Sequence, residues 1–280
     1  MTMTDMSSDR VATGGRQRRE PSLTFWLLRH ENALLGLGTT LAALLLWEIA
    51  VRIGLADPLF TSSPSRILSA GYQMFADGSI YPHLAISGLE LLVGYSLAIL
   101  VAVPLGILLG WYRRLNAAFD PIISALYATP RIALVPLIVI WFGIGLGSKF
   151  AIIFLSAIFP ILINTIAGVQ SVDRDFVKVG RSFGASDRQM FLTVVLPASV
   201  PFLLTGLRLG LGHALIGIVV GELYAAQAGI GFMIAQAGAT FQTDKLMVGI
   251  ILIAGAGVIL TNLLRLIERR FDRWRPTNRL

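Results

Sequence analysis

The sequence predicts an all-α membrane protein that crosses the bilayer about six times. Of its 280 residues, 55% are hydrophobic and only 14% are charged, whereas soluble domains carry about 25% charged residues. The mean hydropathy is +0.73, and the apolar residues fall in runs of membrane-spanning length, about 20 residues. These observations exclude an ordinary water-soluble protein.

Six runs are expected to be transmembrane helices, at residues 33–53, 84–110, 119–144, 149–169, 194–222 and 246–267. The first run is long enough to span, so we interpret it as a retained helix and not as the short core of a cleaved signal. Polar residues 1–30 are expected to form an N-terminal tail and residues 271–280 a C-terminal tail. Residues 31–270 then form the transmembrane domain.

The chain has a net charge of +7, and the positions of its basic residues predict the orientation of the spans. Basic residues gather in both tails, in the turn Arg113–Arg114 and in the loop 171–192, and Lys and Arg beside spans mark the cytoplasmic side. With six crossings, all these segments and both termini lie in the cytoplasm. The basic residues do not form the concentrated patch that nucleic-acid binding requires.

The third run contains Pro130 and Pro136, which are expected to interrupt its helix because proline lacks a backbone donor. Broken backbone at membrane depth is tolerated where it is buried in protein or lines a cavity. Arg131 lies between the two prolines, near mid-membrane, where a charge costs about 2.5–3.5 kcal/mol. Its guanidinium either faces a cavity and suits a carboxylate, sulfonate or nitrate, or pairs with a buried acid or carbonyl and holds the break together.

Two further charges lie in the fifth run. Arg208 and Glu222 are close to the same helical face. Arg208 is near enough to the cytoplasmic side to extend its charge into water, and Glu222 is expected to have a gating or structural role at the outer end. The candidate pathway residues are therefore Pro130, Arg131, Pro136, Arg208 and Glu222. Small residues in the fifth and last runs predict close helix contacts, either within one subunit or between subunits.

The loop 171–192 reads as two short helices meeting at a glycine. Phe176, Val179 and Phe183 recur at helical spacing. Gly184 is suited to end the first helix in a left-handed conformation. Ser186 with Gln189 has the spacing of a capping box that starts the second helix. A loop with its own apolar face is shaped to dock on a partner.

The run from Gly180 through Gly184 to the Val-Val-Leu-Pro that ends at Pro197 resembles the EAA loop of binding-protein-dependent ABC transporter permeases. The flanking segments PRIALVPLIVIWFGIGLGSK and PFLLTGLRLGLGHALIGIVVGELYAAQAGIGFMI resemble the nitrate, sulfonate and taurine branch of that family. Residues 178–180, Lys-Val-Gly, stand where the family has Glu-Ala-Ala, so Lys178 reverses the expected charge. The resemblance assigns ATPase coupling to Phe176, Lys178, Val179, Gly180, Arg181, Phe183, Gly184, Ala185, Ser186 and Pro197.

The resemblance implies a MetI-like, type I importer permease fold and a bacterial inner-membrane location. It also implies three kinds of partner: a second permease copy, two cytoplasmic ATPase subunits that bind ATP and Mg²⁺, and an extracytoplasmic binding protein that delivers a small, anionic solute. This chain has no nucleotide loop or hydrolase motif, so we expect no catalytic residue, cofactor or metal site. It also has no cysteine and only three histidines.

Two rival functions can be weighed against the permease. An ion-coupled secondary transporter would need intramembrane acids arranged as a relay, and Glu48 and Glu90, near the outer ends of the first two runs, fit this poorly. An intramembrane enzyme would need a catalytic cluster, which the sequence does not offer.

Overall fold

A computed structural model describes residues 23–172 and 174–271, and every regular element in that part of the chain is helical. The elements in order are α1 (Leu23–Arg52), α2 (Pro58–Thr61), α3 (Pro64–Ala76), α4 (Ile80–Trp111), α5 (Arg113–Ala128), the 3₁₀ helix η1 (Arg131–Leu134), α6 (Val135–Phe142), α7 (Leu146–Gln170), α8 (Arg174–Ser182), α9 (Asp187–Met190), the π-helix η2 (Phe191–Val195), α10 (Leu196–Ala225), α11 (Ile230–Ala239) and α12 (Thr243–Phe271).

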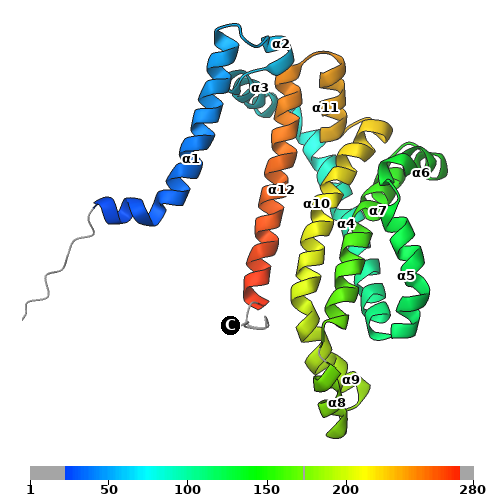
Figure 1. The fold of residues 1–280 in the computed structure, drawn as a ribbon. Coiled ribbons are helices and arrows are strands. Elements are labelled where there is room, and N and C mark those ends of the chain that lie inside the picture. Colours follow the sequence, from blue (N-terminus) through cyan, green and yellow to red (C-terminus); the bar gives the residue numbers. More distant parts are fainter. Residues whose placement is uncertain (1–22, 173, 272–280) are drawn as a thin grey trace, which may run out of the picture.

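Five helical runs are long and apolar enough to cross a membrane, and the bent pair made by α5 and η1–α6 adds a sixth. The prediction of an all-α protein with about six spans is therefore confirmed. In Figure 1 the spans run alternately up and down the bundle. One end of the bundle carries α2, α3 and α11, and the opposite end carries α8 and α9. We call these the α11 end and the α8 end.

The third span differs from its prediction in one respect. The helix stops at Ala128 and resumes at Arg131, with a bend of 86° between the two halves. Pro130 marks the break, as expected, whereas Pro136 lies in the first turn of α6. Proline is tolerated in a first turn because the N–H that it lacks would have no helical partner there. Only one of the two prolines therefore interrupts the span.

The centre of the bundle is α7, which packs against α4 on one side and α10 on the other. Its neighbours present small residues at the contact. An added Cβ at Gly106 of α4 would lie 2.6 Å from Thr165 Cβ, and one at Gly210 of α10 would lie 2.6 Å from Ile161 Cγ1. The glycines of α10 at this contact therefore serve packing within one subunit, which was one of the two predicted roles.

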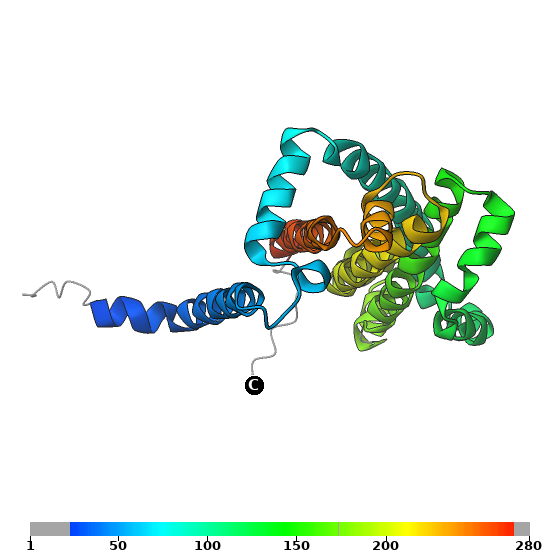
Figure 2. The same ribbon diagram turned by 90° about the horizontal axis from the view of Figure 1, so that it is seen from above.

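Three short helices stand where the sequence predicted loops, at 54–83 and 223–245. A small apolar core explains α3 and α11: Ile67 and Met74 of α3 are buried against Met233 of α11 and Val248 of α12. Helix α2 has no buried residue and follows the N-cap residue Asp57, whose side chain accepts a hydrogen bond from Leu59 N. α1 packs on α3 and otherwise stands apart from the bundle in both views (Figures 1 and 2). Helix α1 already begins at Leu23, inside the predicted N-terminal tail; residues 1–22 and 272–280 lie outside the described residues.

Candidate functional site

The loop at the α8 end has the predicted form of two short helices that meet at a glycine. Helix α8 ends at Ser182, and Gly184 follows with φ +77°, the left-handed region that favours glycine. The Ser186 Oγ accepts a hydrogen bond from Gln189 N, and the Gln189 side chain accepts one from Ser186 N at 2.8 Å. This is a complete capping box, so the bend and the start of α9 are confirmed.

The structure also gives a reason for Gly180. A side chain at this position would overlap Met190, which is buried at the end of α9. Gly180 therefore allows α8 to lie directly on α9. The sequence placed Gly180 in a motif but offered no physical reason for it, because Met190 lies ten residues away across the bend.

An apolar face of α8 remains uncovered. Phe176, Val179 and Phe183 are exposed by 67%, 53% and 88%, although they share one helical face. The surrounding charges are paired locally: Lys178 Nζ lies 2.8 Å from Asp175 Oδ1, and an Arg181 guanidinium nitrogen lies 3.1 Å from Asp187 Oδ1. Lys178 thus has an acidic partner within its own helix. Phe176, Val179 and Phe183 thus form an exposed apolar patch, and exposed apolar patches are typical of interaction surfaces.

The remaining members of the predicted coupling set lie close by. Ala185 N donates to Gly180 O at 3.0 Å, which closes the turn. Pro197 lies in the first turn of α10, and α9, η2 and α10 form one helical run from Asp187 to Ala225. The second half of the loop therefore continues directly into a membrane span.

A cavity of about 430 Å³ lies at the break in the third span. It is enclosed by the end of α5, η1, α6, α7 and α10, and its lining includes Tyr127, Thr129, Pro130, Arg131, Ile132, Val135, Ile138, Ile152, Leu155, Ser156, His213, Ile216, Gly217 and Val220. The lining contains one arginine, one histidine and several hydroxyl groups, and it contains no aspartate or glutamate. Arg131 is therefore the one side chain of this lining that carries a fixed charge.

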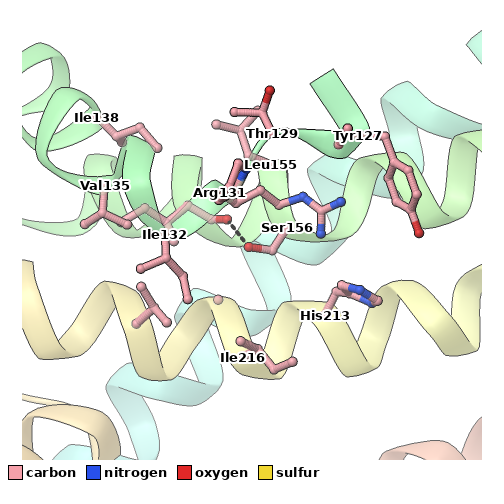
Figure 3. A pocket seen from close by; sticks show the side chains of 15 residues that line it. Tyr127, Thr129, Arg131, Ile132, Val135, Ile138, Leu155, Ser156, His213 and Ile216 are labelled. Atoms are coloured by element: carbon pink, nitrogen blue, oxygen red, sulfur yellow. Dashed lines mark hydrogen bonds between the residues drawn. The ribbon is translucent and has the colours of Figure 1, made fainter. Parts of the chain in front are cut away.

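Arg131 projects into this cavity (Figure 3). Its guanidinium carbon lies 5.2 Å from the centre of the Tyr127 ring and 5.7 Å from that of Phe159, within the range of cation–π attraction. Its Nε is buried and has no hydrogen-bond partner. No carboxylate within residues 23–172 and 174–271 forms an ion pair with it. Arg131 therefore faces the cavity without an acidic partner among the described residues.

His213 and Ser156 are cavity residues that the sequence analysis missed. His213 projects from α10 and Ser156 from α7 (Figure 3). Nothing near them in the sequence signalled a site, because Arg131 meets them only through helix packing. Ser156 Oγ donates to Ile152 O at 2.7 Å, as a hydroxyl on a helix commonly does.

Three of the predicted pathway residues lie away from this cavity. Pro136 is not in its lining. Arg208, which is half-buried, forms an ion pair with the buried Glu268 of α12, so it joins two helices near the α8 end. Glu222 is fully buried at the α11 end, where it accepts hydrogen bonds from Ser87 Oγ and Gly231 N.

Glu48 and Glu90, the acids considered for an ion relay, each form polar contacts with other residues of this chain. Glu48 accepts a hydrogen bond from Arg52 Nε at 2.8 Å and another from Ser65 Oγ at 2.8 Å. Glu90 is fully buried and forms an ion pair with Lys149 of α7. Each acid therefore has a local partner, and the two sit on different helices.

A bundle of membrane-spanning helices with a broken span, an internal cavity and an exposed helix pair at one end defines a multi-pass permease subunit. Comparisons with known proteins specify which kind. The family of binding-protein-dependent transport system inner membrane components matches residues 102–273, which is more than half of the chain.

Named relatives extend this match. The chain is 37% identical over 254 residues to the taurine transport system permease protein TauC of Escherichia coli, covering 89% of this chain and 92% of TauC. It is 34% identical over 230 residues to SsuC of Bacillus subtilis, which is named for aliphatic sulfonates transport, covering 82% and 83% of the two chains. A chain of the inward-facing MetNI methionine ABC transporter superposes with a TM-score of 0.55 at 19% identity, over 70% of this chain and 94% of that one.

The chain belongs to the family of binding-protein-dependent transport system inner membrane components. It is the non-catalytic, multi-pass inner-membrane permease of an ABC importer of the taurine and sulfonate family, with a MetI-like fold. This membership replaces the secondary-transporter and enzyme alternatives.

Proposed function

We propose that this permease imports a small organic anion of the sulfonate type and that the Arg131 cavity is part of its path. The observation that carries the proposal is a half-buried arginine that faces the cavity, with its Nε buried and without a hydrogen-bond partner and with no acidic residue in the cavity lining. The names of TauC and SsuC, with taurine and aliphatic sulfonates, point to the same class of solute.

The chemistry of the cavity supports a sulfonate with an apolar body. A guanidinium offers parallel N–H donors to two oxygens of a tetrahedral or planar anion. The neighbouring rings of Tyr127 and Phe159 both contact Arg131 without neutralising it. Ile132, Val135 and Ile138 supply apolar surface on the same wall, which suits an alkyl chain. A neutral or cationic solute would gain nothing from Arg131.

We further propose that the working importer contains two copies of this chain, two cytoplasmic ATPase subunits and a binding protein. The exposed apolar side chains of Phe176, Val179 and Phe183 are the surface on which an ATPase subunit would dock. Closure of the ATPases would move the α8–α9 loops and switch the cavity between inward and outward access. ATP and Mg²⁺ then belong to the partner.

The same proposal orients the chain with its α8 end in the cytoplasm. Arg113, Arg114 and the basic α8–α9 loop lie at that end of the bundle, and the positive-inside rule places such segments inside. The N-terminal and C-terminal tails, both basic, follow them. The α11 end is then the outer end, which would receive solute from the binding protein.

Substitution of Arg131 tests the anion path. In the assembled complex, Arg131→Gln should lower sulfonate uptake about tenfold or more, because a charge-assisted pair is worth about 1.5–3 kcal/mol, while ATP hydrolysis without solute stays near the parental rate. Arg131→Lys should recover only part of the uptake, since it keeps the charge but loses the planar fork.

Arg114→Gln is the control, because Arg114 is an exposed charge outside the cavity. A stable Arg131→Gln complex with parental uptake would refute the proposal; a loss of thermal stability with unchanged solute affinity would assign Arg131 to structure alone.

A further inference from the structure

The two aliphatic hydroxyl groups in the lining of the Arg131 cavity both use their hydrogen within the protein. Thr129 Oγ1 donates to Ala125 O at 2.9 Å, and Ser156 Oγ donates to Ile152 O at 2.7 Å. The Ser156 bond is drawn in Figure 3. A hydroxyl group has one hydrogen and two lone pairs, so each oxygen can still accept a hydrogen bond but has no second hydrogen to donate.

The histidine of the lining is in the same situation. His213 Nδ1 lies 2.9 Å from Leu209 O, the carbonyl one turn earlier on α10. A carbonyl oxygen has no hydrogen to donate, so Nδ1 carries the hydrogen of this bond. In the neutral form of the ring the other nitrogen then has none, and Nε2 offers a lone pair. The bond directs Nδ1 toward the helix backbone, and the ring extends from α10 into the cavity (Figure 3).

Arg131 and these acceptors together form a two-part recognition pattern. Arg131 supplies a positive charge and N–H donors for an anionic group, whereas Thr129, Ser156 and His213 supply acceptors from three different helical segments. Either hydroxyl group would have to give up its bond to the backbone before it donated to the anion. Tyr127, the remaining neutral polar residue of the lining, meets Arg131 with its ring. A solute with only an anionic group and an alkyl chain leaves the acceptors unused.

His213 is the acceptor best placed to meet a solute. Ser156 is only 7% exposed, and an added Cβ at Gly217 of α10 would lie 2.8 Å from its Oγ, so this oxygen lies at the contact between α7 and α10. His213 and Thr129 are half-buried and reach the open part of the cavity. A neutral imidazole nitrogen is more basic than a hydroxyl oxygen and is therefore the stronger acceptor of these two.

We propose that the cavity selects a sulfonate that also carries an uncharged hydrogen-bond donor, with neutral His213 as the residue that accepts from it. The inference rests on the proposed path through the Arg131 cavity and narrows its substrate class to hydroxyalkanesulfonates. An ammonium group would also donate to His213 Nε2, but it would bring a second positive charge close to Arg131. A hydroxyl group donates without that repulsion.

The absence of cysteine from the sequence allows a direct test with a single Leu155→Cys reporter in the cavity lining. Maleimide labelling of the permease chain is measured in the permease–ATPase complex without binding protein. The solutes are two matched pairs: terminally hydroxylated ethanesulfonate against ethanesulfonate, and terminally hydroxylated propanesulfonate against propanesulfonate. We expect the hydroxylated member of at least one pair to protect at about fivefold lower concentration, the factor that one net hydrogen bond contributes.

Substitution of His213 assigns this preference to its acceptor. In His213→Phe, which keeps a planar ring and removes the acceptor, both members of a pair should protect equally. His213→Gln returns an acceptor oxygen and should restore part of the preference. Thr165→Val is the control, since Thr165 Oγ1 donates to Ile161 O on α7 but lies outside the cavity lining, and it should keep the parental preference. If His213→Phe does not assemble, His213→Leu is judged in the same way.

The pattern of protection decides the question. The proposal is overturned if both members of each pair protect equally in the parental complex, or if the preference persists without His213. It is also overturned if His213→Phe weakens both members equally, because His213 would then donate to the anion in its charged form. If no sulfonate protects the reporter, the Arg131 path itself is refuted, so the failure of the path and the failure of the donor preference give different results.

Discussion

Position 184 requires glycine because of its backbone conformation and not because of a lack of space. A Cβ at this position would meet no atom within 4 Å, yet φ is +77°. The contrast with Gly180, where a side chain would overlap Met190, separates two uses of glycine in one loop. Gly184 sets the angle between α8 and α9, and Gly180 sets their separation.

Replacement of Gly184 by valine should therefore uncouple the loop without unfolding the membrane domain. A left-handed conformation costs a residue with a Cβ about 1–2 kcal/mol, and a β-branched residue more. We expect normal insertion and assembly but a several-fold fall in solute transported per ATP hydrolysed, measured in proteoliposomes. Gly184→Asn is the control, because asparagine tolerates positive φ, and it should retain most of the coupling. Full coupling in Gly184→Val would contradict the role proposed for the loop.

The residues predicted correctly from sequence are those whose partners are near in the chain. The capping box joins Ser186 to Gln189 three positions later, so its residue types reveal it. Arg131 was recognised by its depth, but its ring partner Phe159 and its cavity neighbour His213 belong to other helices. Glu222 likewise meets Ser87 across 135 residues. The residue pattern within one segment does not show such contacts, because they join helices that are distant in the sequence.

At the scale of elements, α7 is confined between two faces of small residues. Gly94, Gly106 and Gly110 of α4 approach it from one side, and Gly206, Gly210 and Gly217 of α10 from the other. Membrane helices gain little from burying apolar surface against each other, so close packing of small residues provides much of their affinity. The stability of the bundle should depend on these positions more than on its large side chains.

Paired substitutions of glycine test this. Gly106→Ala should lower the thermal stability of the purified complex, since its Cβ would lie 2.6 Å from Thr165 Cβ and 3.1 Å from Leu162 O, and overpacking costs about 1–3 kcal/mol. Gly212→Ala on α10 should have no such effect, because no atom lies within 4 Å of its added Cβ. Equal melting temperatures for the two variants would show that α4 and α7 can separate without penalty.

Composition alone predicted the long helical runs correctly, but it did not predict the short helices. Helices α2, α3 and α11 have 4, 13 and 10 residues, below the length of a span, so hydropathy alone marked their segments as loops. Their helical form depends on tertiary contacts, such as Ile67 and Met233 in one small core. Pro130 and Pro136 looked equivalent in sequence, and only the position of the α6 start distinguishes the break from the harmless first-turn proline.

At the scale of the whole molecule, two helices connect the α8–α9 loop to the Arg131 cavity. α7 runs from Leu146, past Ser156 in the cavity lining, to the start of the loop, and α10 returns from the loop past His213 in the same lining. Because α7 and α10 pack closely along their length, a displacement of the loop would be transmitted to both.

The composition of the cavity leads to a prediction about which sulfonates this chain prefers. Taurine carries an ammonium group beside its sulfonate, and the cavity lining offers no aspartate or glutamate to receive it. The faces of Tyr127 and Phe159, which could accept a cation, are already occupied by Arg131, and like charges disfavour each other in a site of low dielectric. A simple alkanesulfonate presents its anion to Arg131 and its chain to the isoleucine and valine wall.

We therefore expect butanesulfonate to protect a Leu155→Cys reporter from maleimide at a lower concentration than taurine. The measurement uses the permease–ATPase complex without binding protein, so that the selectivity of the binding protein does not affect the result. Arg131→Gln should abolish the protection by both compounds. Stronger protection by taurine would mean that a carboxylate from outside this lining reaches the ammonium, and the second copy of the chain would then be the first place to look for it.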